Sequence, residues 1–204
     1  MICIVDYGIG NTNSFLNAYK KLNINVKLTN KKKDLEQAKR IILPGVGSFD
    51  FGMFQLQQYD LDELLTDLVL NKKVPILGVC LGMQLMLSNS EEGQSKGLGW
   101  IKGESKSFPF DKNLCRPHMG WNNLSIFKSN KSFLKNITKD DYFYFLHSYC
   151  VNLTNEPYVE AQSFYGINFC SILRKENIFG VQFHPEKSHN SGLVLLKNFY
   201  EMKI

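Results

Sequence analysis

Short β-prone runs alternate with helical patterns over residues 1–90, and this alternation is the feature that most restricts the fold. Strands joined through helices build parallel sheets, because each helix returns the chain to the edge where the next strand begins. The expected strands span 1–5, 24–28, 40–43 and 74–79, and the expected helices span 15–22, 34–39, 61–70 and 80–87. The sequence therefore predicts an α/β fold with a largely parallel central sheet flanked by helices.

The pattern changes after about residue 91, where strand-like segments are separated by turn residues without a long helical pattern between them. These segments span 101–108, 123–127, 142–146, 158–164, 169–173 and 178–183. A final helix is expected over 192–202. The chain has 204 residues, of which 44% are hydrophobic, enough for a packed core. Since no repeat or low-complexity linker interrupts it, we predict one domain spanning 1–204.

Charge and cysteine content exclude several classes of protein. The net charge of +5 is spread along the chain, and its densest runs, 31–33 and 72–73, are too short for a nucleic-acid-binding surface. Five cysteines without a CxxC pair indicate neither a disulfide framework nor a zinc knuckle, and the four histidines lack paired ligand spacing, so no metal and no cofactor are expected. Without a signal-peptide core or a membrane-spanning run, we expect a cytoplasmic protein.

Cys80 lies where a buried strand is expected to run into a helix, and Gly78 and Gly82 flank it as G-x-C-x-G. This is the spacing of a nucleophile elbow, a sharp strand-to-helix turn that needs small neighbours. The helix N-terminus would supply unpaired N–H groups and a positive dipole, which stabilise a thiolate. Taken alone, the pattern fits an ordinary buried thiol in a tight turn equally well.

A second candidate is the end of the β-prone run 178–183, which continues into His184-Pro185-Glu186. Residues two apart in an extended segment point to the same side, so Glu186 can fix the tautomer of His184 and stabilise its protonated form. A cysteine nucleophile needs such a base. By itself the tripeptide is more often a polar turn. The nucleophile elbow in the same chain favours a catalytic role for it.

The third candidate is the segment 41–48, where a predicted strand opens into Pro-Gly-Val-Gly. Glycines allow backbone N–H groups to face a ligand, and acyl transfer needs such donors aimed at a developing oxyanion. Leu81, directly after the cysteine, would supply a further N–H. Pro-Gly loops are common, so this segment also depends on the other two.

Together, LPGVG at 43–47, GVCLGMQL at 78–85 and FHPEKS at 183–188 resemble the triad-type, class I glutamine amidotransferases, which have a flavodoxin-like α/β domain. Within them, VDYGIGN at 5–11, PHMGWN at 117–122 and FLHSY at 145–149 look like the glutaminase subunit of imidazole glycerol phosphate synthase. The resemblance runs from the first residues to the C-terminal helix. It implies that the chain hydrolyses L-glutamine and passes ammonia to a synthase subunit of histidine biosynthesis.

Carried over by position, the resemblance makes Cys80 the nucleophile, His184 the general base and acid, and Glu186 the residue that orients the histidine. The thiol would attack the γ-carboxamide of glutamine, and water would hydrolyse the resulting thioester. Gln84 also fits on spacing, since it lies one helical turn after the cysteine. The remaining implied residues are Val46 and Leu81 as oxyanion donors, and Gly47, Gln84, Ser148 and Tyr149 as substrate-binding residues.

The implied partner is a cyclase subunit with a (β/α)₈ barrel, which would form a heterodimer with this chain. In such proteins the Pro-Gly-Val-Gly strand can adopt a conformation in which no N–H points into the site until the partner binds its ligand. We therefore expect the chain to be a weak glutaminase when it is alone. The residues expected to face the partner are Asn11, His118, Met119, Trp121, Tyr144 and Lys187.

Three alternatives stay open at this point. The ammonia acceptor could be a sugar-aminating synthase served by a paralogous glutaminase with the same triad. A non-catalytic docking subunit is disfavoured by the intact Cys80, His184 and Glu186. A free-standing cysteine hydrolase is disfavoured by the segment 117–122, which adds nothing to hydrolysis and looks like a contact surface.

Overall fold

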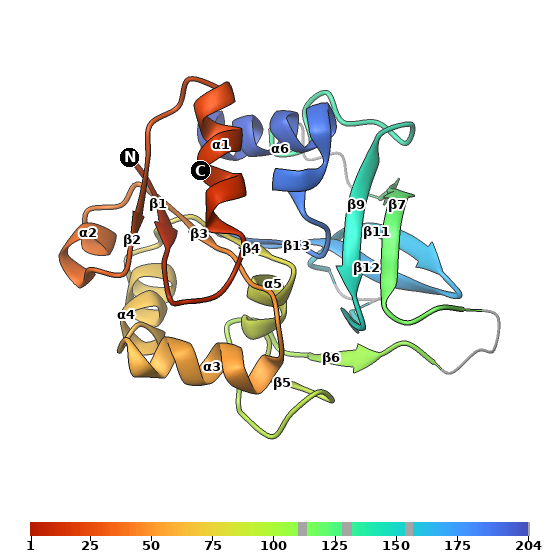
Figure 1. Ribbon diagram of the computed structural model, residues 1–204, viewed down its shortest axis with the longest axis horizontal. Helices are drawn as coiled ribbons and strands as arrows, with labels where there is room; N and C mark the ends of the chain where they lie inside the picture. Colours follow the sequence, from red (N-terminus) through yellow and green to blue (C-terminus); the bar gives the residue numbers. More distant parts are fainter. Residues whose placement is uncertain (110–113, 128–131, 154–156, 204) are drawn as a thin grey trace.

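The computed structural model describes residues 1–109, 114–127, 132–153 and 157–203. Five parallel strands form one part of the central sheet, and four of them come from the first half of the chain (Figure 1). In spatial order they are β2 (Val26–Thr29), β1 (Ile2–Val5), β3 (Arg40–Leu43), β4 (Ile76–Val79) and β13 (Ile178–Val181). The predicted parallel sheet is confirmed. One strand from the C-terminal part, β13, joins it directly beside β4.

Beyond β13 the sheet becomes mainly antiparallel. Its strands are β12 (Ile167–Lys175), β10 (Tyr149–Val151), β6 (Glu104–Ser107) and β5 (Asn89–Ser90), with β11 (Val159–Tyr165) and β8 (Ser125–Ile126) off this path. A separate two-stranded sheet pairs β7 (His118–Asn123) with β9 (Tyr142–His147). Segment 117–122, predicted from the sequence to be a contact surface, is thus largely a strand.

Helices cover both faces of the parallel strands. They are α1 (Thr12–Lys21), α2 (Lys32–Glu36), α3 (Phe49–Gln58), α4 (Asp62–Thr66), the π-helical turn η1 (Asp67–Asn71), α5 (Leu81–Leu85), the 3₁₀ turn η2 (Pro185–Lys187) and α6 (His189–Glu201). Figure 1 shows α1 and α6 on one side and α3, α4 and α5 on the other. Among the described residues, no helix combines the length and apolar character needed to cross a membrane.

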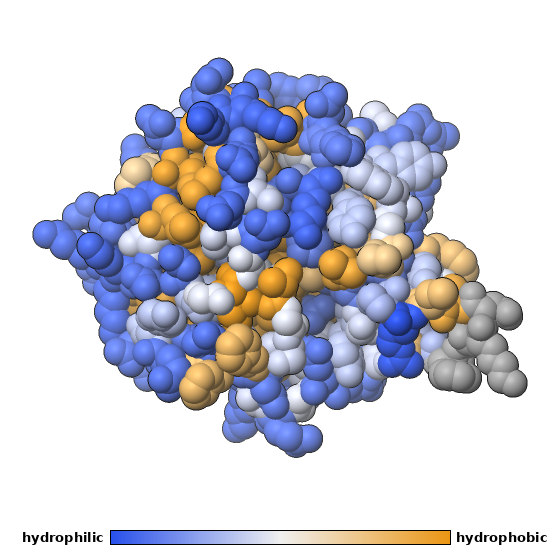
Figure 2. Space-filling model, viewed as in Figure 1, coloured by the Kyte–Doolittle hydropathy of each residue, from blue (hydrophilic) through white to orange (hydrophobic). Residues whose placement is uncertain are grey.

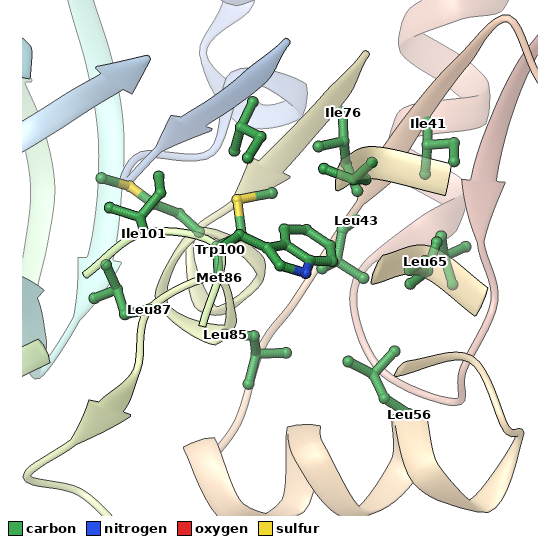
Figure 3. Packing of buried hydrophobic residues seen from close by; sticks show 14 of the residues in the cluster. Ile41, Leu43, Leu56, Leu65, Ile76, Leu85, Met86, Leu87, Trp100 and Ile101 are labelled. Carbon is green, nitrogen blue, oxygen red and sulfur yellow. The ribbon is translucent and has the colours of Figure 1, made fainter. Parts of the chain in front are cut away.

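Two hydrophobic clusters follow from the alternation of side chains along the strands. Cys3 and Val5 point toward the cluster under α3 and α4, whereas Ile2 and Ile4 point toward the cluster under α1 and α6. Trp100 belongs to the first cluster, where it lies near Leu43 and Met86 in Figure 3. Both faces of the parallel strands are therefore buried, which leaves the carboxyl ends of the strands for a site.

Candidate active site

Cys80 occupies the turn between β4 and α5, and its backbone has φ 54° and ψ −111°. A non-glycine residue rarely adopts a positive φ, and here the surrounding packing imposes it. A Cβ on Gly82 would lie 2.0 Å from the Leu43 carbonyl oxygen, and one on Gly78 would lie 2.7 Å from the Gly82 oxygen. The flanking glycines are thus required by close backbone contacts, as the elbow pattern predicts.

The loop between β3 and α3 packs directly on the start of α5. A Cβ on Gly45 would lie 2.6 Å from the Gly82 backbone nitrogen, so these two glycines hold the loop against the helix N-terminus. The buried hydroxyl of Tyr7, a residue that the sequence patterns do not single out, donates to the Pro44 carbonyl at 2.5 Å. These contacts bring the predicted oxyanion loop close to the first N–H groups of α5, which lack partners within the helix.

His184 and Glu186 form a buried pair just after β13. Nδ1 of His184 lies 2.8 Å from Oε1 of Glu186, and the two side chains are 2% and 1% exposed. Burial alone would lower the pKa of His184, but the neighbouring Cys80 and Glu186 side chains outweigh it and raise that pKa to about 10. Nε2 of His184 has no hydrogen-bond partner among the described residues. That nitrogen is available for proton exchange with a thiol.

A pocket of about 260 Å³ opens beside the elbow. It brings together seven residues that were predicted from the sequence, namely Val46, Gly47, Cys80, Leu81, Gln84, Ser148 and Tyr149. Glu92, Pro117, Leu146 and His147 complete its lining and were not predicted. The pocket therefore joins the elbow and the oxyanion loop to the turn between β9 and β10, and its volume suits a small amino acid.

The side chain of Gln84 is already engaged inside the protein. Its Nε2 donates to the Tyr149 carbonyl oxygen at 2.9 Å and to Oε1 of Gln182 at 3.1 Å. Both donor positions of the amide are thus used, which leaves its carbonyl oxygen as the group that can meet a substrate.

Glu92 contributes a carboxylate to the pocket from the loop after β5. Its Oε2 accepts a hydrogen bond from the Phe49 backbone N–H at 2.8 Å. Burial raises the pKa of Glu92, the Phe49 N–H opposes this, and the Asp50 charge adds to it. No periodic pattern in the sequence points to this loop. A carboxylate at this place is suited to an ammonium group such as the α-amino group of an amino acid.

The structure corrects one prediction about the partner face, because His118 is buried and only 3% exposed. Its ring stacks between Phe145 and Tyr165, with centroids 5.0 and 4.1 Å away. Strand β7 explains this, since its alternation turns position 118 inward and positions 119 and 121 outward. The side chain of His118 therefore belongs to the interior and does not face a partner.

His118 is hydrogen bonded to His147, a residue to which the sequence motifs assign no chemistry. Nδ1 of His118 lies 3.1 Å from Nε2 of His147, whose Nδ1 lies 2.8 Å from the Tyr149 carbonyl oxygen. Because a carbonyl only accepts, His147 donates from Nδ1 and accepts at Nε2, and His118 donates to it. Burial lowers the pKa of His118 to about 4 and that of His147 to about 3, so both rings are neutral near pH 7.

Four of the other predicted partner-facing residues lie near one another or on the same strand. Met119 and Trp121 are 66% and 46% exposed, and the Trp121 ring lies 5.8 Å from that of Tyr144. Nζ of Lys187 lies 5.8 Å from the Tyr144 ring centroid. Asn11, the fifth, is exposed and caps α1 through a bond from the Ser14 N–H at 3.3 Å. Figure 2 shows a band of apolar residues across the middle of the face in view.

Comparison with known proteins gives consistent matches along nearly the whole chain. The family model "Glutamine amidotransferase class-I" matches residues 3–202. The chain is 46% identical over 202 residues to "Imidazole glycerol phosphate synthase subunit HisH" of Leptospira borgpetersenii, covering 98% of each chain. It is 45% identical over 205 residues to the protein of the same name from Bdellovibrio bacteriovorus, covering 99% of this chain and all of that one.

Among solved structures, the fold is similar to one described as "Crystal structure of glutamine amidotransferase". The TM-score is 0.77 at 19% identity, and the match covers 98% of each chain. At this identity the likeness shows the shared fold alone.

Proposed function

Since the chain belongs to the class I glutamine amidotransferases, and within them to the HisH subunits of imidazole glycerol phosphate synthase, we propose that Cys80, His184 and Glu186 are its catalytic triad. The chain is a glutamine amidotransferase that serves histidine biosynthesis. The observation that carries the triad is the buried His184–Glu186 pair. Nε2 of His184 has no hydrogen-bond partner among the described residues, and the adjacent Cys80 raises the pKa of this imidazole.

The Cys80 sulfur attacks the γ-carboxamide carbon of glutamine as a thiolate, while its proton is held on Nε2 of His184. The negative charge that develops on the amide oxygen is stabilised by the N–H groups of Leu81 and Val46. His184 then donates its proton to the leaving nitrogen, and ammonia departs from a γ-glutamyl thioester. Glu186 holds the imidazole in the tautomer that presents Nε2 to the sulfur.

Water completes the cycle. His184 removes a proton from the water as it attacks the thioester carbon, and Cys80 leaves as the thiolate when glutamate is released, so that His184 is again protonated. Glu92 is the carboxylate that would pair with the α-amino group of the substrate, since it lines the same pocket as Cys80 and is held there by the Phe49 N–H. Gly47, Ser148 and Tyr149 lie in the lining where the rest of the amino-acid group would bind.

The partner that consumes the ammonia is proposed to be a (β/α)₈ barrel cyclase. The exposed apolar side chains of Met119 and Trp121 support a partner interface on this face, because aromatic and methionine residues are typical of interface cores. Tyr144 links that face to the triad, since its backbone carbonyl oxygen accepts a hydrogen bond from the backbone N–H of His184 at 2.8 Å. A cytoplasmic location and a single-domain organisation remain predictions.

The proposed triad is tested by mixing the purified chain with the cyclase and its ligand and measuring glutamate release. We expect strong stimulation by the partner, and complete loss of release in Cys80→Ala. Cys115→Ala is the matched control, because that cysteine is exposed and lies outside the pocket lining. Release that survives Cys80→Ala would contradict the mechanism, and stimulation by a sugar-aminating synthase alone would reassign the acceptor.

The partner face is tested separately through binding. Trp121→Ala should weaken the affinity for the cyclase by about 2 kcal/mol, the size typical of an aromatic residue at an interface centre. Binding is measured by isothermal titration calorimetry, with Phe127→Ala as the control, since Phe127 is also exposed but is not among the predicted contacts. Equal affinities of Trp121→Ala and the unmodified chain would exclude this face as the docking surface.

A further inference from the structure

Gln182 is a completely buried polar residue beside the nucleophile, and no sequence motif gives it a role. It follows β13 and precedes His184 by two residues. Its Nε2 lies 3.7 Å from the Cys80 sulfur, within hydrogen-bonding distance for a sulfur acceptor. The side chain thus contacts the atom that would form the thioester.

The orientation of the Gln182 amide follows from its neighbours. Nε2 of Gln84 donates to the Tyr149 carbonyl oxygen, which can only accept, so that atom of Gln84 must be the nitrogen. The same nitrogen lies 3.1 Å from the Gln182 side chain, which must therefore present its oxygen there. The remaining end of the Gln182 amide, its N–H₂ group, is then directed at the sulfur.

The backbone holds this arrangement in register. Strands β4 and β13 pair Val79 with Val181, and the Cys80 N–H donates to the Val181 carbonyl oxygen at 2.8 Å. The Gln182 N–H donates in turn to the Ser171 carbonyl oxygen on β12 at 3.0 Å. Cys80 and Gln182 each directly follow a central strand, so these backbone bonds hold the two residues at neighbouring positions.

We propose that Gln182 is a catalytic residue that donates a hydrogen bond to the Cys80 thiolate, and that Gln84 is the positioning residue that orients it. The inference rests on the proposed function, since it needs Cys80 as the nucleophile. A hydrogen bond to a charged acceptor is about twice as strong as one between neutral groups, so the N–H stabilises the thiolate more than the thiol. Gln182 then acts on the sulfur as a donor from the same segment of the chain that carries His184.

The proposal is tested on the intact chain by the pH dependence of Cys80 alkylation with iodoacetamide. Mass spectrometry of the Cys80 peptide separates this residue from the other four cysteines. Gln182→Met keeps the length of the side chain but removes its N–H. We expect the midpoint of the alkylation profile to rise by about one pH unit, the size of one charge-assisted hydrogen bond. Ser171→Ala, a buried change on the adjacent strand that removes a bond to the Ser163 hydroxyl but keeps the carbonyl that Gln182 uses, should leave the midpoint unchanged.

Folding of each variant is checked by its circular dichroism spectrum. If Gln182→Met does not fold, Gln84→Met decides the question, since it removes the amide that orients Gln182 and should raise the same midpoint. An unchanged midpoint in the folded variant would overturn the proposal and leave Gln182 with a packing role. The glutamate-release assay with the partner tests the proposed function separately, because the alkylation profile is measured without glutamine or cyclase.

Discussion

The pocket has two walls that come from different regions of the fold. The parallel strands provide one wall, on which Cys80 and the oxyanion loop follow the carboxyl ends of β4 and β3, and His184 follows the neighbouring strand β13 behind this lining. The strands β9 and β10, each antiparallel to other strands, provide the other, with Leu146 and His147 at the end of β9, Ser148 in the turn and Tyr149 at the start of β10. The proposed reactive groups come from the first region, whereas the second contributes Ser148 and Tyr149, which are proposed to bind the substrate.

The two buried histidines show what this division means chemically. On the parallel side, the pKa of His184 is raised because Cys80 and Glu186 outweigh the effect of its burial. On the antiparallel side, the pKa of His147 is lowered because burial dominates and His118 and His184 add to it. The same side chain therefore carries a proton on one wall and serves as a neutral hydrogen-bonding group on the other.

Close packing around the elbow of the parallel wall should give the largest change in stability when it is disturbed. Gly82→Ala should lower the free energy of unfolding by at least about 4 kcal/mol, because its Cβ would lie 2.0 Å from the Leu43 carbonyl oxygen and no side-chain rotation relieves this. Urea unfolding measures the change.

Gly99→Ala is the matched control for this substitution. Gly99 has φ +68°, but a Cβ at this position would meet no atom within 4 Å, so only the conformational cost of about 1–2 kcal/mol is expected. If both variants lost equal stability, close packing at the elbow would not be the reason for glycine there.

Much of the parallel wall is predictable from sequence, since glycine spacing and apolar runs are local signals. Helix α3 shows where such signals fail. Its buried residues Phe49, Gly52, Met53 and Leu56 have helical spacing, but a glycine takes one core position and the exposed Phe51 and Phe54 obscure the stripe. The sequence pattern consequently predicts no helix between 43 and 61, where the structure has one.

The functional residues of the antiparallel wall are harder to predict, because their roles depend on contacts between segments that are distant in the sequence. The burial of His118 follows from the alternation of β7, but only once that segment is identified as a strand. Glu92 reaches the pocket through the Phe49 N–H, 43 positions away in the sequence. The parallel wall has one such residue as well, since Gln182 acquires its contact with Cys80 only through the pairing of β13 with β4.

Glu186→Gln is expected to have the next largest effect, because it removes the charge that stabilises protonated His184. The rate constant kcat of glutamine hydrolysis should fall by about 10²–10⁴-fold. KM should change little, since Glu186 is absent from the lining of the glutamine pocket. Steady-state glutamate release with the cyclase measures both constants, and a change confined to KM would contradict the orienting role.

The same substitution affects stability as pH rises. The pKa of His184 is raised in the folded chain, so its contribution is present below the unfolded value of about 6.5 and is lost as pH rises toward about 10. Between pH 6.5 and 8, urea unfolding of the unmodified chain should therefore show decreasing stability. Glu186→Gln should reduce this slope, and an unchanged slope would show that Glu186 is not needed to keep His184 protonated.

The neutral histidines of the antiparallel wall should make the chain less stable as pH falls, a smaller effect than that of His184 and in the opposite direction of pH. Their pKa values lie below the unfolded value of about 6.5, so the unfolded chain takes up protons first as pH falls. Each histidine should then cost about 1 kcal/mol of stability between pH 6 and 5, a range above the ordinary titration of most carboxylates. Glu92, whose pKa is raised, opposes this loss in part.

His147→Gln should remove about half of that acid-induced loss, and the double variant with His118→Gln should remove nearly all of it. Urea unfolding at pH 6 and pH 5 measures both, each compared with the unmodified chain. If the double variant lost as much stability as the unmodified chain over this range, the two histidines would not be neutral in the folded state. The proton assignment of the bond between His118 and His147 would then be different, and the contrast between the walls would disappear.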